Sequence, residues 1–214
     1  MATIKTFVFN PFQENTYLIY DETKECIIVD AGCYTADEQN ELAAFINQNN
    51  LTVRQIVNTH GHVDHVLGNA FVKAQYKASI AANPEDYSLM QSASAHAIMY
   101  GLTIDDVPGI DINLNHGDTI RFGETSLKVI HTPGHSQGGI CLLSEADNFI
   151  LSGDTLFRSS IGRTDLPGGD YDQLINSIET QLLTLSPETK VYPGHGEPTT
   201  IGWEKQNNPF LAKQ

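Results

Sequence analysis

The sequence has few basic residues and no long apolar run. Lys and Arg number 12 against 26 Asp and Glu, which gives a formal net charge of −14. Nucleic acid and anionic membrane surfaces would both repel such a chain, so we expect neither as a partner. No apolar stretch approaches the length of a membrane span. Residues 1–12 lack an apolar segment followed by a small-residue cleavage site, so we expect no signal peptide.

Cysteine is also scarce. Cys26, Cys33 and Cys141 are odd in number and widely spaced, so they match no metal or redox motif and are predicted to be buried thiols. Unpaired thiols are typical of a reducing compartment, and we expect a cytoplasmic protein. The length of 214 residues suits a single domain, 1–214.

Short apolar and β-branched runs alternate with helical patterns. Thr35-x-x-Glu38 and Asp170-x-x-Gln173 have the spacing of helix N-terminal caps, and each is followed by apolar residues at helical intervals. Residues 83–116 are predicted to form a helical insertion, either a lid over a cleft or an ordinary pair of packing helices. Strands are predicted at residues 5–9, 16–20, 26–29, 53–57, 126–131, 139–143 and 149–152, with a last one at 190–192.

Residues 60–65 read His-Gly-His-Val-Asp-His, which has the composition of a metal-binding cassette. His60 and His62 are two positions apart and would point to the same side of an extended segment, with Gly61 allowing a tight turn. Asp64 and His65 are adjacent and cannot easily share one cation with the first pair. The cassette therefore predicts two metal ions side by side.

Three later segments share one design, in which an apolar strand and a turn precede a residue that can bind metal. They end in His135, Asp154 and His195, and two of them turn through Pro-Gly. In a chain that already carries the cassette, these residues are predicted to be further ligands. His131 is expected to lie on its strand, while His96 and His116 are not expected to bind metal.

These motifs resemble those of the metallo-β-lactamase superfamily, and most closely its glyoxalase II branch, the hydroxyacylglutathione hydrolases. The resemblance implies an α/β fold, an αββα sandwich of two mixed sheets with helices on the outer faces, over one domain. It also implies a set of metal ligands: His60, His62 and His135 for one ion, Asp64, His65 and His195 for the other, and Asp154 bridging both. The matching segments are residues 59–65, 131–135, 153–157 and 192–196.

The resemblance further implies a binuclear metallohydrolase of thioesters such as S-lactoylglutathione. A hydroxide that bridges the metals would attack the acyl carbon, with Asp64 orienting it. A thiolate leaves easily because the pKa of a thiol is about 8.5, so no strong acid is needed. Zinc is the first expectation, with iron or manganese as alternatives. The competing functions are a mononuclear iron persulfide dioxygenase and a lactone or β-lactam hydrolase.

Two arginines are candidates for substrate binding. Arg163 lies where the branch places a basic residue that contacts glutathione, and Arg158 precedes it. Either can instead form a structural ion pair with Asp165 or Asp170. Asp165 and Glu197 stand where the branch often has tyrosines, and they disfavour an anionic thiol. The residues after His195 are few, so the branch's C-terminal helical region is expected to be absent or reduced.

Overall fold

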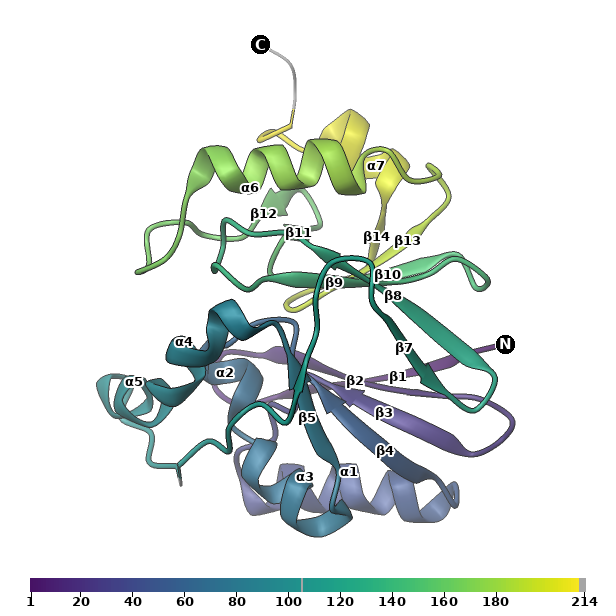
Figure 1. Cartoon of the computed structure of the whole chain (residues 1–214), viewed down its shortest axis with the longest axis vertical. Coiled ribbons are helices and arrows are strands. Elements are labelled where there is room, and N and C mark those ends of the chain that lie inside the picture. The colour runs from purple at the N-terminus through teal and green to yellow at the C-terminus, as the bar shows by residue number, and fades with distance from the viewer. Residues whose placement is uncertain (105, 212–214) are drawn as a thin grey trace.

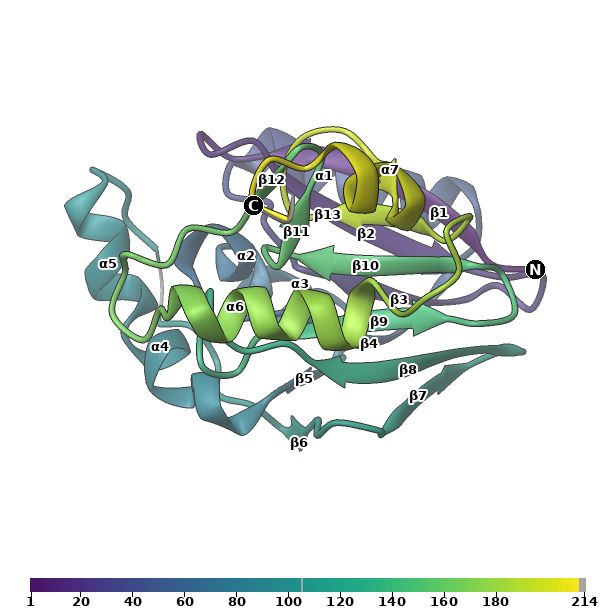
Figure 2. The same ribbon diagram turned by 90° about the horizontal axis from the view of Figure 1, so that it is seen from above.

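Two β-sheets lie face to face with helices on both outer faces (Figures 1 and 2), in a computed structural model that describes residues 1–104 and 106–211. Both sheets mix parallel and antiparallel neighbours. The αββα sandwich predicted from the sequence is therefore confirmed.

Each large sheet has six strands. The first sheet runs β1 (Thr3–Phe9), β2 (Glu14–Tyr20), β3 (Glu25–Val29), β4 (Thr52–Val57), β5 (Ser79–Ala82) and β6 (Ile112–Asn113). The second runs β14 (Thr199–Thr200), β13 (Lys190–Pro193), β10 (Phe149–Gly153), β9 (Ile140–Ser144), β8 (Thr125–His131) and β7 (Thr119–Phe122). A small hairpin pairs β11 (Leu156–Phe157) with β12 (Ser160–Ile161).

The outer faces carry the longer helices. α1 (Ala36–Gln48) and α3 (Asn69–Tyr76) cover the first sheet, whereas α6 (Tyr171–Ser177) and α7 (Ile201–Asn207) cover the second (Figure 1). The predicted caps are present, since Thr35 Oγ1 accepts from the Glu38 amide and Asp170 Oδ1 accepts from the Gln173 amide. α6 continues into a π-helical turn, η2 (Ile178–Leu182).

Alternating side chains along the strands fill three layers of core. Ile27 points between the sheets, while its neighbour Ile28 packs beneath α1 and α3. In the second sheet, Leu142 faces the first sheet and Leu143 faces α6. Both faces of each sheet are buried, which is why these strands read as continuous apolar runs.

The structure contains strands that the sequence patterns did not predict. β5, β6, β7 and β14 are only two to four residues long, too short to produce a clear alternation. Because β14 follows residues 190–192, the prediction that this strand is the last was wrong. Residues 83–116 contain a 3₁₀ turn, η1 (Pro84–Asp86), then α4 (Tyr87–Gln91), α5 (Ala93–Met99) and β6.

One end of the sandwich gathers the predicted ligands. β8, β10 and β13 run in the same direction, so their carboxyl ends meet at one edge of the second sheet. The short helix α2 (Val63–Val66), α4 and α5 lie at the same end (Figures 1 and 2). No helix in the described part of the chain is long and apolar enough to cross a membrane.

Candidate metal centre

The first triad consists of His60, His62 and His135. His60 and His62 follow β4, and His62 is the N-cap residue of α2. His135 follows β8 through the Pro-Gly turn. Each residue offers one nitrogen within 4.8 Å of the others, and His62 Nδ1 lies 2.8 Å from His135 Nε2. Three imidazoles that converge in this way can hold one divalent cation.

The second triad consists of Asp64, His65 and His195. Asp64 and His65 lie on α2, whereas His195 comes from the loop after β13. Asp64 Oδ2 is 3.1 Å from His195 Nε2 and 3.5 Å from His65 Nε2. This set also has its ligand atoms within 4.8 Å of one another, and it adds a carboxylate to two imidazoles.

Asp154 lies between the two triads. Its Oδ1 is 3.4 Å from His65 Nε2 in the second triad, and its Oδ2 is 3.5 Å from His135 Nε2 in the first. Oδ2 is also 3.6 Å from His195 Nε2. A carboxylate that lies within 3.6 Å of ligand atoms from both triads has the position needed to bridge two cations.

Several atoms of the cluster are buried without a hydrogen-bond partner. They are His60 Nε2, His65 Nε2 and Asp154 Oδ1. Buried polar atoms are costly unless something satisfies them, and these three face the shared centre. Divalent cations would satisfy all three, so the residues present fit the metal ions that the sequence predicts.

Glycine next to the ligands permits this close approach. A Cβ on Gly194 would lie 2.1 Å from Asp154 Oδ1 and 2.8 Å from His65 Cε1. Gly153 has a φ of +48°, and its Cβ would lie 2.5 Å from Thr59 Oγ1. A larger residue at Gly194 would push Asp154 and His65 away, and one at Gly153 would displace Thr59, which precedes His60.

The sequence profile of the Metallo-beta-lactamase superfamily matches residues 9–195. This range includes both triads and Asp154. The chain belongs to this superfamily. Its members are metallo-hydrolases.

Individual relatives agree with this assignment. The chain is 36% identical over 207 residues to the hydroxyacylglutathione hydrolase GloC of Haemophilus influenzae, covering 94% of this chain and 93% of that protein. Among solved structures it is similar to the B3 metallo-beta-lactamase BLEG-1, with a TM-score of 0.89, 32% identity and 99% and 100% coverage of the two chains. It is also similar to TTHA1623 in a di-iron-bound form, with a TM-score of 0.87, 36% identity and 97% and 100% coverage. The resemblance predicted from the motifs is confirmed.

Asp30 supports the second triad of this metallo-beta-lactamase fold and was missed in the sequence. It follows β3 with a φ of +53°. Its carboxylate accepts hydrogen bonds from the Thr59 amide at 2.7 Å and the Thr59 hydroxyl at 2.6 Å, and Oδ2 lies 3.0 Å from His65 Nδ1. With its oxygens occupied in this way, Asp30 orients His65 rather than offering a free ligand. Its position after a buried strand was the available signal.

Asp86 supports the first triad and was also missed. It comes from η1, and its Oδ2 accepts from the Gly61 amide at 2.8 Å and from Ser136 Oγ at 2.7 Å. Its Oδ1 accepts from the Gly138 amide at 2.6 Å. One buried carboxylate thus joins the cassette to the loop that carries His135. No sequence pattern indicated this contact, because the three segments are far apart in the chain.

The start of β2 holds the loop of His195. The Asn15 amide donates to the Gly194 carbonyl at 2.7 Å, and Asn15 Nδ2 donates to the carbonyls of Pro193 and Gly196, both at 2.9 Å. The neighbouring Glu14 is fully buried, and its Oε1 lies 4.0 Å from His65 Nδ1. Burial raises the pKa of Glu14 well above its usual range.

The two triads differ in their affinity for protons. Burial, reinforced by neighbouring imidazoles, lowers the pKa of His60 well below its usual range and that of His62 to about 3. Burial also acts on His65, but the nearby carboxylates outweigh it and raise the pKa of His65 well above its usual value. Burial acts on His195 too, but its hydrogen bond to Asp64 and the charges of Asp154 and Asp64 together outweigh it and raise the pKa of His195. The carboxylates lie on the side of the second triad.

The remaining histidines lie outside the triads. His131 is on β8 with Nε2 2.9 Å from the Gln137 carbonyl, and its amide donates to His116 Nδ1 at 3.3 Å. His96 is on α5 and lines a cleft of about 570 Å³ that opens over both triads.

In the first triad, His135 Nδ1 donates to the Arg163 carbonyl at 2.7 Å, which leaves Nε2 facing the cleft.

The two candidate arginines differ in position. Arg163 lines the cleft and forms two hydrogen bonds to Asp165, Nε to Oδ1 at 2.7 Å and Nη2 to Oδ2 at 2.8 Å. Arg158 does not line the cleft, and it lies 3.5 Å from Glu197 and over the ring of Trp203. The ion pair expected with Asp165 is present for Arg163, whereas Arg158 pairs with Glu197.

Proposed function

We propose that this protein is a binuclear metallohydrolase that cleaves a thioester such as S-lactoylglutathione. The observation that carries the proposal is the position of Asp154, whose carboxylate lies 3.4 Å from His65 Nε2 in the second triad and 3.5 Å from His135 Nε2 in the first. A single metal ion would need only one triad. Two triads that share a carboxylate support two ions held side by side.

Different residues would have different roles in the reaction. The first triad would hold one ion and the second triad would hold the other, while Asp154 would contact both. A pair of divalent ions, with zinc as the first expectation and iron as the second, would supply an ionised water near neutral pH and polarise the acyl oxygen. Asp64 lines the cleft and would orient the attacking water through its carboxylate. The His135 bond to the Arg163 carbonyl fixes the tautomer that presents Nε2.

A thioester suits this site because its leaving group is easily expelled. The pKa of a thiol is about 8.5, so the thiolate departs without a proton donor. Outside the triads and Asp154, the cleft is lined mainly by apolar side chains. The similarity to a hydroxyacylglutathione hydrolase supports the same choice. The similarity to a B3 metallo-beta-lactamase makes β-lactams the second class to test.

A cytoplasmic location is part of the proposal. Cys26, Cys33 and Cys141 are all free and buried, and burial raises the pKa of each thiol. Buried, protonated thiols are inert, and unpaired cysteines are typical of reducing compartments.

Elemental analysis combined with a substrate panel tests the proposal. Purified protein should carry two metal ions per chain and should hydrolyse S-lactoylglutathione. Chelation should abolish the activity, and added zinc or iron should restore it. The panel should also include a lactone, a β-lactam and a persulfide, with oxygen uptake recorded. One iron per chain with oxygen consumption on the persulfide would favour the dioxygenase and overturn the proposal.

A further inference from the structure

The cleft over the two triads has an apolar wall and, within the part of the chain that the structure describes, a single lysine or arginine, Arg163, which is already paired with Asp165. We infer that it selects thioesters whose thiol part is uncharged and apolar, and that Asp165 is a specificity-determining residue that disfavours anionic thiols such as glutathione. The inference rests on the proposed thioester hydrolysis and narrows its substrate class.

The apolar wall comes from three separate parts of the chain. Phe12 follows β1, and its ring meets that of Tyr100 edge-on at 5.0 Å between centroids. Met99, at the end of α5, also lines the cleft although its side chain is 81% exposed. On the other side, the ring of Phe157 lies 6.1 Å from that of His195. Exposed apolar side chains gathered around a cleft are typical of a ligand site, and they favour a ligand that buries apolar surface.

The charge of the cleft points the same way. Among the described residues that line it, Arg163 is the only lysine or arginine. Asp165 occupies the guanidinium through two parallel hydrogen bonds, the geometry that a substrate carboxylate would otherwise use. A carboxylate on the thiol would have to displace Asp165 or bind the remaining Nη1 edge of the guanidinium, and in either position it would lie next to the negative charge of Asp165. The net charge of −14 adds a general repulsion of anions.

The pair is exposed, which limits the size of the effect. The side chains of Arg163 and Asp165 are 58% and 67% exposed, and exposed ion pairs contribute little free energy. We therefore expect Asp165 to shift a preference by a few fold. The apolar wall sets the larger part of the selection.

Binding of two non-hydrolysable thioethers to the zinc-loaded protein tests the inference. S-benzylglutathione carries carboxylates, whereas N-acetyl-S-benzylcysteamine carries the same benzyl group on an uncharged thiol. By calorimetry, we expect the wild type to bind the uncharged thioether about tenfold more tightly, because the carboxylates of the glutathione thioether would lose solvation against the apolar wall. Asp165→Asn should tighten binding of the glutathione thioether by about two- to fivefold and leave the uncharged one unchanged.

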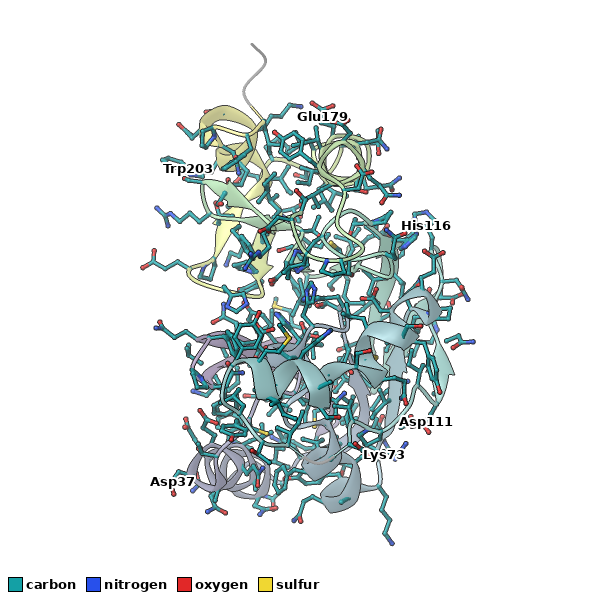
Figure 3. The ribbon with its side chains drawn as sticks, turned by 90° about the vertical axis from the view of Figure 1, so that its left-hand side faces the viewer. Asp37, Lys73, Asp111, His116, Glu179 and Trp203 are labelled. Atoms are coloured by element: carbon teal, nitrogen blue, oxygen red, sulfur yellow. The ribbon has the colours of Figure 1, made fainter. Side chains whose placement is uncertain are left out.

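A matched variant separates the local contact from the loss of one negative charge. Glu179→Gln also removes one exposed negative charge and leaves the Arg163–Asp165 pair intact. Glu179 (labelled in Figure 3) lies on η2, beyond the C-terminal end of α6, whereas the N-terminal end of α6 adjoins the His135 loop, so this variant should change neither affinity. Equal or tighter binding of the glutathione thioether by the wild type would overturn the inference, as would no response to Asp165→Asn. A protein that shows the predicted preference but hydrolyses no thioester would contradict only the proposed function.

Discussion

The two triads differ in charge and in the residues that support them. The first triad has imidazoles only, and Asp86 holds the two loops that carry it through backbone and hydroxyl contacts. The second triad contains Asp64 and has Asp30 and the buried Glu14 behind His65. Neighbouring carboxylates make the second triad attractive to protons as well as to cations. In the first triad, burial lowers the pKa of His60 and His62, so neither needs to lose a proton before a metal binds.

The largest effect should come from the residue that both triads share. Asp154→Asn keeps the shape of the side chain but removes the charge that faces both sites. We expect hydrolysis to fall by more than about 100-fold, beyond the effect of an outer contact, and the affinity for both ions to fall together. Competition with a chelating dye would measure both affinities.

Asp64→Asn is the comparison for this variant. Asp64 lies only in the second triad, so this variant should weaken the binding of one ion and leave the binding of the other unchanged. Equal losses in the two variants would mean that Asp154 does not bridge.

The supporting aspartates should separate the triads. Asp30→Asn removes the carboxylate that contacts His65 Nδ1. It should lower the affinity of the second triad for its metal ion by about 10- to 100-fold and change the affinity of the first triad little. Asp86→Asn loosens the loops of His62 and His135 and should show the opposite pattern. Metal titration with calorimetry would resolve the two binding steps. The comparison fails if both variants weaken the same step.

Acidification should empty the second triad first. His65 and His195 have raised pKa values, so without metal they hold protons near pH 6.5, and a cation must displace them. The affinity of the second triad for its metal ion should therefore fall by up to about tenfold per pH unit for each displaced proton. His60 and His62 have lowered pKa values and remain neutral over the same range.

The metal content after dialysis at pH 7.5, 6.5 and 5.5 would therefore fall from two ions to one before reaching none. Loss of both ions in a single step would show that the two sites do not differ in this way.

The smallest effect concerns the buried Glu14, which lies only on the side of the second triad. Its pKa is raised in the folded state, so its contribution to stability is complete below the unfolded pKa of about 4.3 and is lost as pH rises through the folded pKa. Glu14→Gln should stabilise the metal-free protein at neutral pH by about 1 kcal/mol, or about 2–4 °C in Tm. Thermal unfolding from pH 5 to 8 should become less dependent on pH, whereas the exposed control Glu179→Gln should follow the wild type.

Much of the centre could be predicted because its ligands lie in recognisable local patterns. The cassette has four potential ligands in six positions, and Pro-Gly turns mark His135 and His195. The ends of β8, β10 and β13 then meet because the strands run in the same direction. The short strands β5, β6, β7 and β14 escaped prediction because two to four residues carry too little periodicity.

The sequence by itself determined the residue types that can bind metal, because ligand spacing is a local property, and its motifs carried the resemblance that implied the fold class. Only the tertiary structure decided which carboxylates support which triad. Asp30, Asp86 and Glu14 come from different elements, and their contacts exist only once the two sheets have packed. The pairing of Arg163 with Asp165 was likewise one of several choices until the loop was folded. A carboxylate's role depends on its neighbours in space, which spacing along the chain does not specify.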